Sequence, residues 1–142
     1  MEFDNKVSLI IDANSKNEAF ARVSVAAFST YLDPTLEEIE DIKMAVSEAV
    51  TNCIIHGYEG EKGEIYIKLG IKENKLYIEI EDRGKGIENI EQAREPLYTS
   101  KPEMERSGMG FTVMEAFMDE IQVISNLGEG TKICMVKKIN RN

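Results

Sequence analysis

After residue 57 the spacing of the apolar residues changes from a helical period to a strand period, and this change limits the fold more than any other feature. Residues 35–56 repeat apolar side chains every three or four positions, the spacing of a helix with one buried face, and Gly57 follows as a stop signal. Residues 65–71 and 76–80 instead alternate apolar and polar side chains. This alternation predicts a β-hairpin with one buried face and one face that is wet or covered by a partner.

Two capping boxes predict where helices begin. Ser15 with Glu18 precedes the stretch AFARVSVAAFSTYL, which we expect to form a helix that ends near Leu32. Thr35 with Glu38 forms the second box and begins the helical stretch described above.

The remaining segments predict further elements: a strand at 7–12, a long aperiodic loop at 82–107, a helix at 109–119, and a closing hairpin of 121–126 and 131–138. This order favours a two-layer α+β sandwich, with the helices gathered on one face of the sheet. With 142 residues, of which 42% are hydrophobic, we expect residues 1–142 to form a single domain.

Charge and cysteine content exclude several classes of function. The chain has 17 Lys and Arg residues against 26 Asp and Glu, so its net charge is −9. Nucleic-acid binding needs a basic surface that neutralises phosphate charge, and this acidic composition argues against one. A protein partner with a basic surface suits the negative charge. No apolar run reaches the length of a membrane span and the amino terminus lacks the features of a signal peptide, so we expect a cytoplasmic protein without membrane contact. Cys53 and Cys134 have no metal or redox spacing, and we interpret both as packed thiols.

One polar stripe interrupts the apolar pattern of the helix predicted at 35–56. Glu48, Asn52 and His56 follow one another at intervals of four, so their side chains lie at the margin of the buried face. A carboxylate and a carboxamide one turn apart are compatible with a solvated helix edge as well as with a site. His56 stands at the helix end, where we expect it to cap or pack rather than to accept phosphate.

Two glycine-rich segments supply the other candidate site elements. The segment DRGKG ends a predicted strand with an acidic acceptor, Asp82, and two glycines that allow close backbone approach. Gly108 and Gly110 stand where the third helix begins, and the unpaired N–H groups of a helix start form a cradle for an anion such as phosphate. Neither segment fits the Rossmann or P-loop pattern, and each alone is compatible with an ordinary turn. Their fixed order, with Gly130 and Thr131 opening the last strand, favours a site.

These motifs resemble the N box, the two glycine boxes and the late threonine of the GHKL superfamily of ATPases and kinases, which includes gyrase, histidine kinases and MutL. Three longer stretches, AFARVSVAAF, SEAVTNCIIHGY and PLYTSKPEMERSGMGFTVMEAFMDE, are similar to the anti-sigma factors that act on the first forespore sigma factor of spore-forming bacteria. This resemblance covers nearly the whole chain. It implies a two-layer sandwich of the GHKL (Bergerat) type, with a mixed, mainly antiparallel sheet.

The resemblance also implies a mechanism. In that family, ATP lies under a mobile lid, here about residues 92–107, Mg²⁺ bridges its phosphates, and the γ-phosphoryl group passes to a serine of an anti-anti-sigma protein. Asn52 would offer its amide oxygen to Mg²⁺, and Glu48 would accept or orient the proton of the substrate hydroxyl. Asp82, aided by Thr131, would accept a hydrogen bond from the adenine amino group.

Further contacts follow from the same resemblance. Gly84 and Gly86 would let the backbone lie against the base and sugar of ATP or ADP. Arg22 would contact the sigma factor and its antagonist, and the protein would form a homodimer through its first strand and helix, in the cytoplasm of the forespore or predivisional cell. Cys53 departs from the family pattern, in which a small residue such as alanine is frequent. The remaining nucleotide contacts are implied at lid residues Thr99, Ser100, Lys101, Arg106 and Ser107 and at the backbone cradle of Gly108, Met109 and Gly110.

Two functional classes are open at this point, and they are compatible with each other. One is an ATP-dependent protein serine kinase that also holds a sigma factor; the other is a nucleotide-switched module that sequesters the sigma factor without kinase activity. Glu48 separates them, because a sequestering module needs no base. Another GHKL ATPase that closes as a clamp is a more distant alternative. A histidine kinase would need a phosphoacceptor histidine on a separate helical segment, for which a single 142-residue domain leaves no room.

Overall fold

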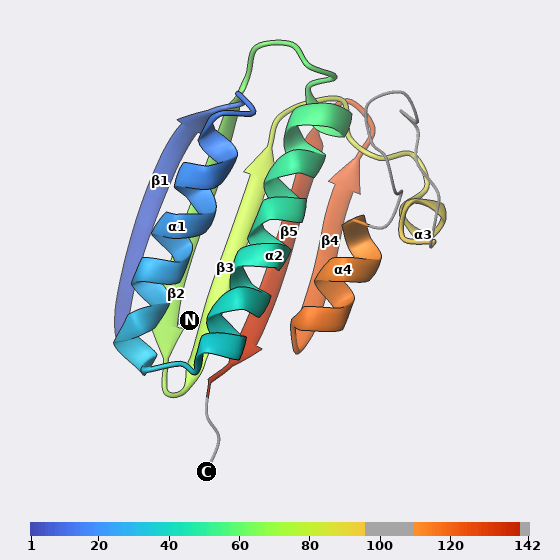
Figure 1. The fold of residues 1–142 in the computed structure, drawn as a ribbon. Coiled ribbons are helices and arrows are strands. Elements are labelled where there is room, and N and C mark those ends of the chain that lie inside the picture. Colours follow the sequence, from blue (N-terminus) through green and yellow to red (C-terminus); the bar gives the residue numbers. More distant parts are fainter. Residues whose placement is uncertain (96–109, 140–142) are drawn as a thin grey trace.

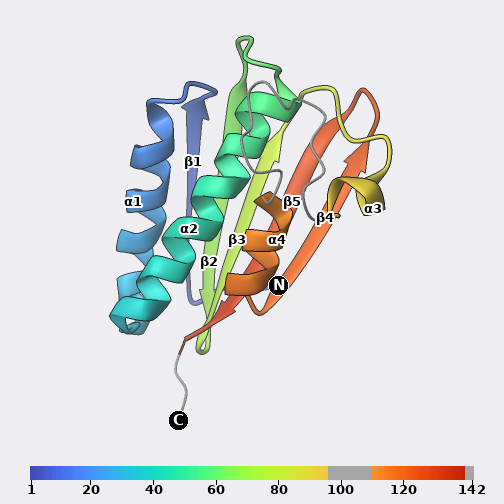
Figure 2. The same cartoon turned by 45° about the vertical axis from the view of Figure 1, so that its right-hand side comes forward.

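The computed structural model describes residues 1–95 and 110–139 of the chain. The strands are β1 (Asn5–Asp12), β2 (Glu64–Lys72), β3 (Lys75–Asp82), β4 (Glu120–Asn126) and β5 (Gly130–Lys138). The helices are α1 (Asn17–Ser29), the 3₁₀ turn η1 (Thr30–Leu32), α2 (Leu36–Asn52), the π-helical turn η2 (Cys53–Gly57), α3 (Ile90–Ala93) and α4 (Gly110–Phe117). Figures 1 and 2 show two layers, with α1, α2 and α4 side by side on one face of the sheet. The predicted α+β sandwich is therefore confirmed.

The five strands lie in the order β1-β2-β3-β5-β4, and each neighbouring pair is antiparallel. The implied mixed character of the sheet is therefore not seen among the described strands. The reason lies in the connections: α1 runs down and α2 runs back up, so the chain enters β2 from the end where β1 finished (Figure 1). The other two adjacent pairs in sequence, β2–β3 and β4–β5, are hairpins.

The core lies between α2 and the middle of the sheet. Alternate residues of β2 and β3, such as Ile67 and Ile78, are buried against the helices, while their neighbours face the other side, as the alternating pattern predicted. Ala45 and Ala49 are fully buried on the sheet-facing side of α2. Their small side chains allow this helix to lie close to the strands, which fixes the position of its end over the sheet.

One of the two predicted capping boxes is wrong. At α2, the Glu38 N–H donates to the Thr35 hydroxyl at 3.1 Å and the Thr35 N–H donates to the Glu38 carboxylate at 2.9 Å, as predicted. At α1, the cap residue is Lys16 and no side chain caps the helix. Lys16 already has helical backbone angles, and the Glu18 carboxylate pairs with Arg22 instead.

The helix ends differ from the predictions in small but informative ways. α1 gives way to η1 and so reaches the predicted end at Leu32. α2 does not simply stop before Gly57 but widens into η2, whose geometry no sequence pattern indicated. α3 is a short helix inside the segment predicted to be an aperiodic loop, and Asn89 caps it through the Gln92 N–H.

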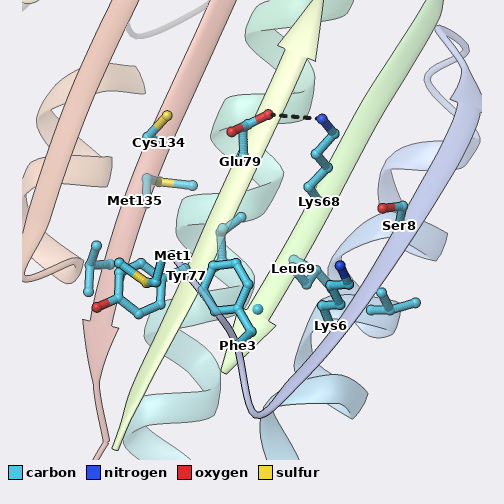
Figure 3. A pocket seen from close by; sticks show the side chains of 14 residues that line it. Met1, Phe3, Lys6, Ser8, Lys68, Leu69, Tyr77, Glu79, Cys134 and Met135 are labelled. Carbon is cyan, nitrogen blue, oxygen red and sulfur yellow. Dashed lines mark ion pairs between the residues drawn. The ribbon is translucent and has the colours of Figure 1, made fainter. Parts of the chain in front are cut away.

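The open face of the sheet carries a hollow of about 670 Å³, seen in Figure 3. Phe3 lies over Gly70, where a Cβ atom would approach the Phe3 ring to 2.6 Å, and its ring packs against Tyr77 at a centroid distance of 5.4 Å. Lys68 and Glu79 face each other there at 4.0 Å. This hollow lies on the face of the sheet opposite the helices, away from the predicted site residues. Among the described helices, none has the combined length and hydrophobicity of a membrane span.

The Thr35→Ala variant is expected to lower the free energy of unfolding by about 1 kcal/mol, because it removes the side-chain acceptor for an otherwise unpaired N–H group at the start of α2. The matched control is Ser15→Ala at the start of α1, where the side chain makes no cap bond. Urea denaturation of both variants checks the prediction. Equal losses of stability in the two variants would contradict the finding that a side chain caps α2 but not α1.

Candidate functional site

Predicted site residues from separate motifs meet at one end of the sheet. Asp82 is the last residue of β3 and pairs with Thr131 near the start of β5, so the two buried side chains are cross-strand neighbours on the helix-covered face. The η2 turn that ends α2 contacts both strands at this end. Figures 1 and 2 show the same meeting of α2, β3 and β5 from two directions.

The carboxyl group of Asp82 is buried, and only 1% of the residue is exposed. Its Oδ1 accepts a hydrogen bond from the Gly84 N–H at 2.9 Å, whereas Oδ2 has no hydrogen-bond partner within the described residues. Burial raises the pKa of Asp82, and the bond from Gly84 opposes that rise. A buried oxygen without a donor destabilises the fold, so its presence points to a donor supplied from outside the described chain.

Glycines surround Asp82 because side chains at their positions would collide with it or with its neighbours. A Cβ atom on Gly57 would lie 2.6 Å from Oδ2 of Asp82, and one on Gly84 would lie 2.0 Å from the Gly57 carbonyl oxygen. A Cβ atom on Gly130 would lie 2.2 Å from the Asp82 carbonyl oxygen. All of these close approaches occur within the chain, so the fold already requires glycine at these positions.

The segment after Asp82 packs against the turn between β4 and β5. Gly86 has a φ of +79°, and a Cβ atom there would lie 2.1 Å from the Asn126 carbonyl oxygen. The Lys85 N–H donates to the Gly57 carbonyl at 3.0 Å, and its carbonyl accepts from the Gly128 N–H at 2.5 Å. The backbone of this segment is therefore fixed from both sides by the chain itself.

The π-helical turn η2 contributes residues that the sequence analysis did not assign to the site. The Tyr58 N–H reaches back five residues to the Cys53 carbonyl at 3.0 Å, and this wider turn sets Gly57 against Asp82. The Tyr58 hydroxyl accepts a hydrogen bond from the Arg83 N–H at 2.8 Å. Gly57 was predicted only as a helix stop, and no sequence signal could have indicated the turn type.

Cys53 is a free, buried thiol that contacts the Asp82 carboxyl group, where its S–H favours the ionised form of the acid. Burial raises the pKa of Cys53, and the Asp82 charge raises it further. The thiol is therefore protonated at neutral pH and is not a nucleophile. The interpretation of Cys53 as a packed thiol is confirmed, and Cys134 is free and half-buried.

Ser125 of β4 is a second residue that the sequence analysis missed. Its hydroxyl accepts a hydrogen bond from the Ile87 N–H at 2.7 Å and lies 2.8 Å from the Thr131 hydroxyl and 2.9 Å from the Gly130 carbonyl oxygen. Ser125 pairs with Thr131 across β4 and β5. Ser125 lies next to Thr131, a predicted site residue, only because of the register of these strands, which cannot be read from the sequence.

Glu48 and Asn52 lie one turn apart near the end of α2, and both are partly exposed. Asn52 directly precedes Cys53, the buried residue whose thiol contacts the Asp82 carboxyl group. The described residues contain no group of three His, Cys, Asp or Glu side chains that could hold a metal. A Mg²⁺ ion that keeps water ligands and binds phosphates needs fewer protein ligands, and the amide oxygen of Asn52 is of the right chemical type.

Gly110 is the first residue of α4 and is partly exposed at the start of that helix. α4 packs against α2 on the side away from α1 (Figures 1 and 2). The other predicted phosphate contacts lie outside the described residues, namely Thr99, Ser100, Lys101, Arg106, Ser107, Gly108 and Met109.

Arg22 lies apart from the residues around Asp82. It is on α1, where Glu18 holds its Nε at 2.8 Å and 35% of its side chain is exposed. Phe20 and Val23, its neighbours on the same helix, expose 56% and 55% of their surface. Arg22 therefore lies on a helix with exposed apolar residues, and α2 lies between that helix and α4 (Figure 1).

Comparison with known proteins gives consistent matches over nearly the whole chain. Residues 12–137 match the family described as the histidine kinase-like ATPase domain. A protein from Clostridium acetobutylicum named anti-sigma F factor is 64% identical, covering 95% of this chain and 94% of that protein. A protein of the same name from Caldanaerobacter subterraneus is 57% identical, covering 100% of this chain and 99% of that protein.

A solved structure shares the fold. The crystal structure of the RsbU and RsbW domains of a Mycobacterium tuberculosis protein superposes with a TM-score of 0.69 over 96% of this chain, at 19% identity. This chain spans 32% of the length of that protein. At this level of identity the likeness concerns the fold alone.

The Asp82→Asn variant is expected to be more stable than the natural chain at neutral pH. Folding raises the pKa of Asp82, so this carboxyl group ionises less readily in the folded chain than in the unfolded chain. The stability that the protonated carboxyl group provides is therefore fully present below the pKa of the unfolded chain and is lost as the pH rises through the pKa of the folded chain. Asparagine does not ionise, so the advantage of the variant grows with pH. Urea denaturation between about pH 4 and about pH 8 measures this, with exposed Glu129→Gln as the control. A constant difference across this range would contradict the burial of an ionisable carboxyl group.

Proposed function

This chain belongs to the anti-sigma F factors of the histidine kinase-like ATPase family, and on that premise we propose that it inhibits a sporulation sigma factor and phosphorylates a serine of its anti-anti-sigma antagonist. Mg-ATP is the proposed phosphoryl donor. The proposal assigns both the kinase and the sequestering role to a cytoplasmic homodimer. Its net charge of −9 suits protein partners with basic surfaces.

The observation that carries the nucleotide part is the buried Oδ2 of Asp82, which has no partner among the described residues. An ionised carboxylate only accepts hydrogen bonds, so this oxygen favours a ligand with a donor group. The amino group of adenine is such a donor. A guanine base would present a carbonyl oxygen at the equivalent position, and two acceptors would then face each other without a proton between them.

The phosphate end of the proposed site lies toward Asn52 and the start of α4. Asn52 would hold Mg²⁺ through its amide oxygen, and the ion would neutralise phosphate charge during transfer. The N–H groups that begin α4 at Gly110 would bind phosphate oxygens. Glu48, one turn before Asn52, would accept or orient the hydroxyl proton of the incoming serine. The predicted residues from Thr99 to Met109 would complete the phosphate contacts.

The exposed surface of α1 supports the partner-binding part. Phe20 and Val23, three residues apart on α1, are large apolar residues left open to solvent, and Arg22 on the same helix is held by Glu18. Exposed aromatic residues and arginine are both enriched at protein interfaces. We assign this face to the sigma factor and the antagonist. The open edge of β1 is the proposed homodimer contact.

Asn52→Ala is expected to weaken Mg-ATP binding at least tenfold, whereas Glu48→Gln should bind nucleotide normally and lose about 10²-fold or more in phosphoryl transfer. Calorimetry measures binding, and labelled phosphoserine on a candidate anti-anti-sigma protein measures transfer. Glu37→Gln is the matched control, since it makes the same change in the exposed first turn of α2. Normal transfer by Glu48→Gln would remove the proposed base. Absence of adenine-nucleotide affinity in the natural chain would overturn the whole proposal.

Arg22→Ala is expected to weaken binding of the sigma factor or antagonist at least tenfold while leaving Mg-ATP affinity unchanged, because α2 separates Arg22 from the base site. Lys43→Ala is the control, since Lys43 also forms an intrahelical ion pair, with Glu40 at 3.3 Å. Surface-binding kinetics with immobilised partner give the affinities. Equal effects of the two variants would indicate a general loss of charge rather than a specific contact.

A further inference from the structure

Lys137 places an ammonium group in the layer between the sheet and the helices. It lies on the same face of β5 as the buried Met135, and only 12% of its side chain is exposed. A charge in such a place is costly unless protein groups replace the lost water. Here the Phe117 carbonyl oxygen accepts a hydrogen bond from the ammonium at 2.7 Å, and the Asp41 carboxylate accepts another at 3.2 Å. The lysine is therefore fully paired, and it joins β5, α4 and α2.

The bond from Lys137 to Phe117 lies at the end of α4. Phe117 is the last residue of this helix, where carbonyl groups have no partner within the helix and a positive charge is favourable. The chain that follows is also bound to β5, since the Asp119 N–H donates to the Val136 carbonyl at 2.9 Å and the Asp119 carboxylate accepts from the Lys138 N–H at 2.6 Å. Neither of these two bonds involves the Lys137 side chain, so a substitution at Lys137 can leave both in place.

The two helices that meet at Lys137 carry the groups assigned to the phosphates at their other ends. Asp41 lies in the first half of α2, whereas Asn52 is the last residue of that helix. α4 packs against α2 and runs antiparallel to it, so Gly110 lies at the end of α4 remote from Lys137 (Figures 1 and 2). α4 has eight residues, whereas α2 has 17 and supplies much of the core. Loss of the joint would therefore displace α4 more than α2.

We propose that Lys137 is a positioning residue for the phosphate end of the nucleotide: it holds α4 against α2, and so keeps the N–H groups at Gly110 in register with the Asn52 amide. The inference rests on the proposed nucleotide function and deepens it. Lys137 does not touch the nucleotide, because its ammonium lies at the far end of α4. The base end does not depend on this joint, since Asp82 is held by Gly84 and by the glycine of η2.

Calorimetry with ADP and with adenosine, each in the presence of Mg²⁺, tests the inference on Lys137→Met. This variant keeps an apolar side chain of similar reach and removes the ammonium. ADP affinity should fall about tenfold, the worth of one aligned hydrogen bond to phosphate, while adenosine affinity should change by less than about twofold. Lys138→Met is the matched control, since it makes the same change at the next residue of β5, which is exposed, and should bind both ligands as the natural chain does.

Several outcomes overturn the inference. Equal losses of ADP and adenosine affinity would mean a loosened fold rather than a displaced phosphate end, and unchanged ADP affinity in Lys137→Met would refute the role of Lys137. If Lys137→Met does not fold, Asp41→Ala removes the link to α2 and leaves the bond to Phe117 in place. It should then lower the affinity for ADP but not for adenosine, and absence of that loss would refute the joint. Failure of the natural chain to bind ADP would instead overturn the proposed function.

Discussion

The burial of one carboxylate, that of Asp82, is the constraint on which the rest of the site depends. A Cβ atom at Gly57 would collide with the carboxyl group itself, whereas Cβ atoms at Gly84 and Gly130 would collide with the backbone of Gly57 and of Asp82. The chain lacks side chains at these three positions, and one oxygen of the carboxyl group has no hydrogen-bond partner among the described residues. A ligand that supplied the missing donor would regain on binding the energy that this unpaired oxygen costs the fold.

The sequence predicted the elements much better than their junctions. The change of period found the hairpin and α2, and the Thr35 box gave the start of that helix. The capping box predicted at Ser15 was wrong, because a sequence motif shows which side chains could form cap hydrogen bonds but not which bonds do form. Here the Glu18 side chain pairs with Arg22. Ser125 could not be found at all, because its place next to Thr131 depends on register across β5, information that arises only when distant strands pair.

Family resemblance and physical structure account for the same glycines in different ways. The resemblance attributes Gly84 to the approach of a nucleotide, whereas the structure already requires glycine there for contact with the Gly57 backbone. The two reasons are compatible, because a backbone tightly held by the chain offers a rigid wall to a ligand. A backbone that is already rigid loses little conformational entropy when a ligand binds. Tight packing within the chain therefore favours recognition of a flat base.

α2 and α4 are joined at the end opposite the base site, through Lys137 of β5. The Lys137 side chain is only 12% exposed, and its ammonium group donates to the Phe117 carbonyl at 2.7 Å and to the Asp41 carboxylate at 3.2 Å. The end of α4 is thus fixed to α2 and β5, while its start at Gly110 lies at the proposed phosphate site. α2 packs against both α4 and α1, so it is the element that connects the proposed phosphate site to the helix that carries Arg22.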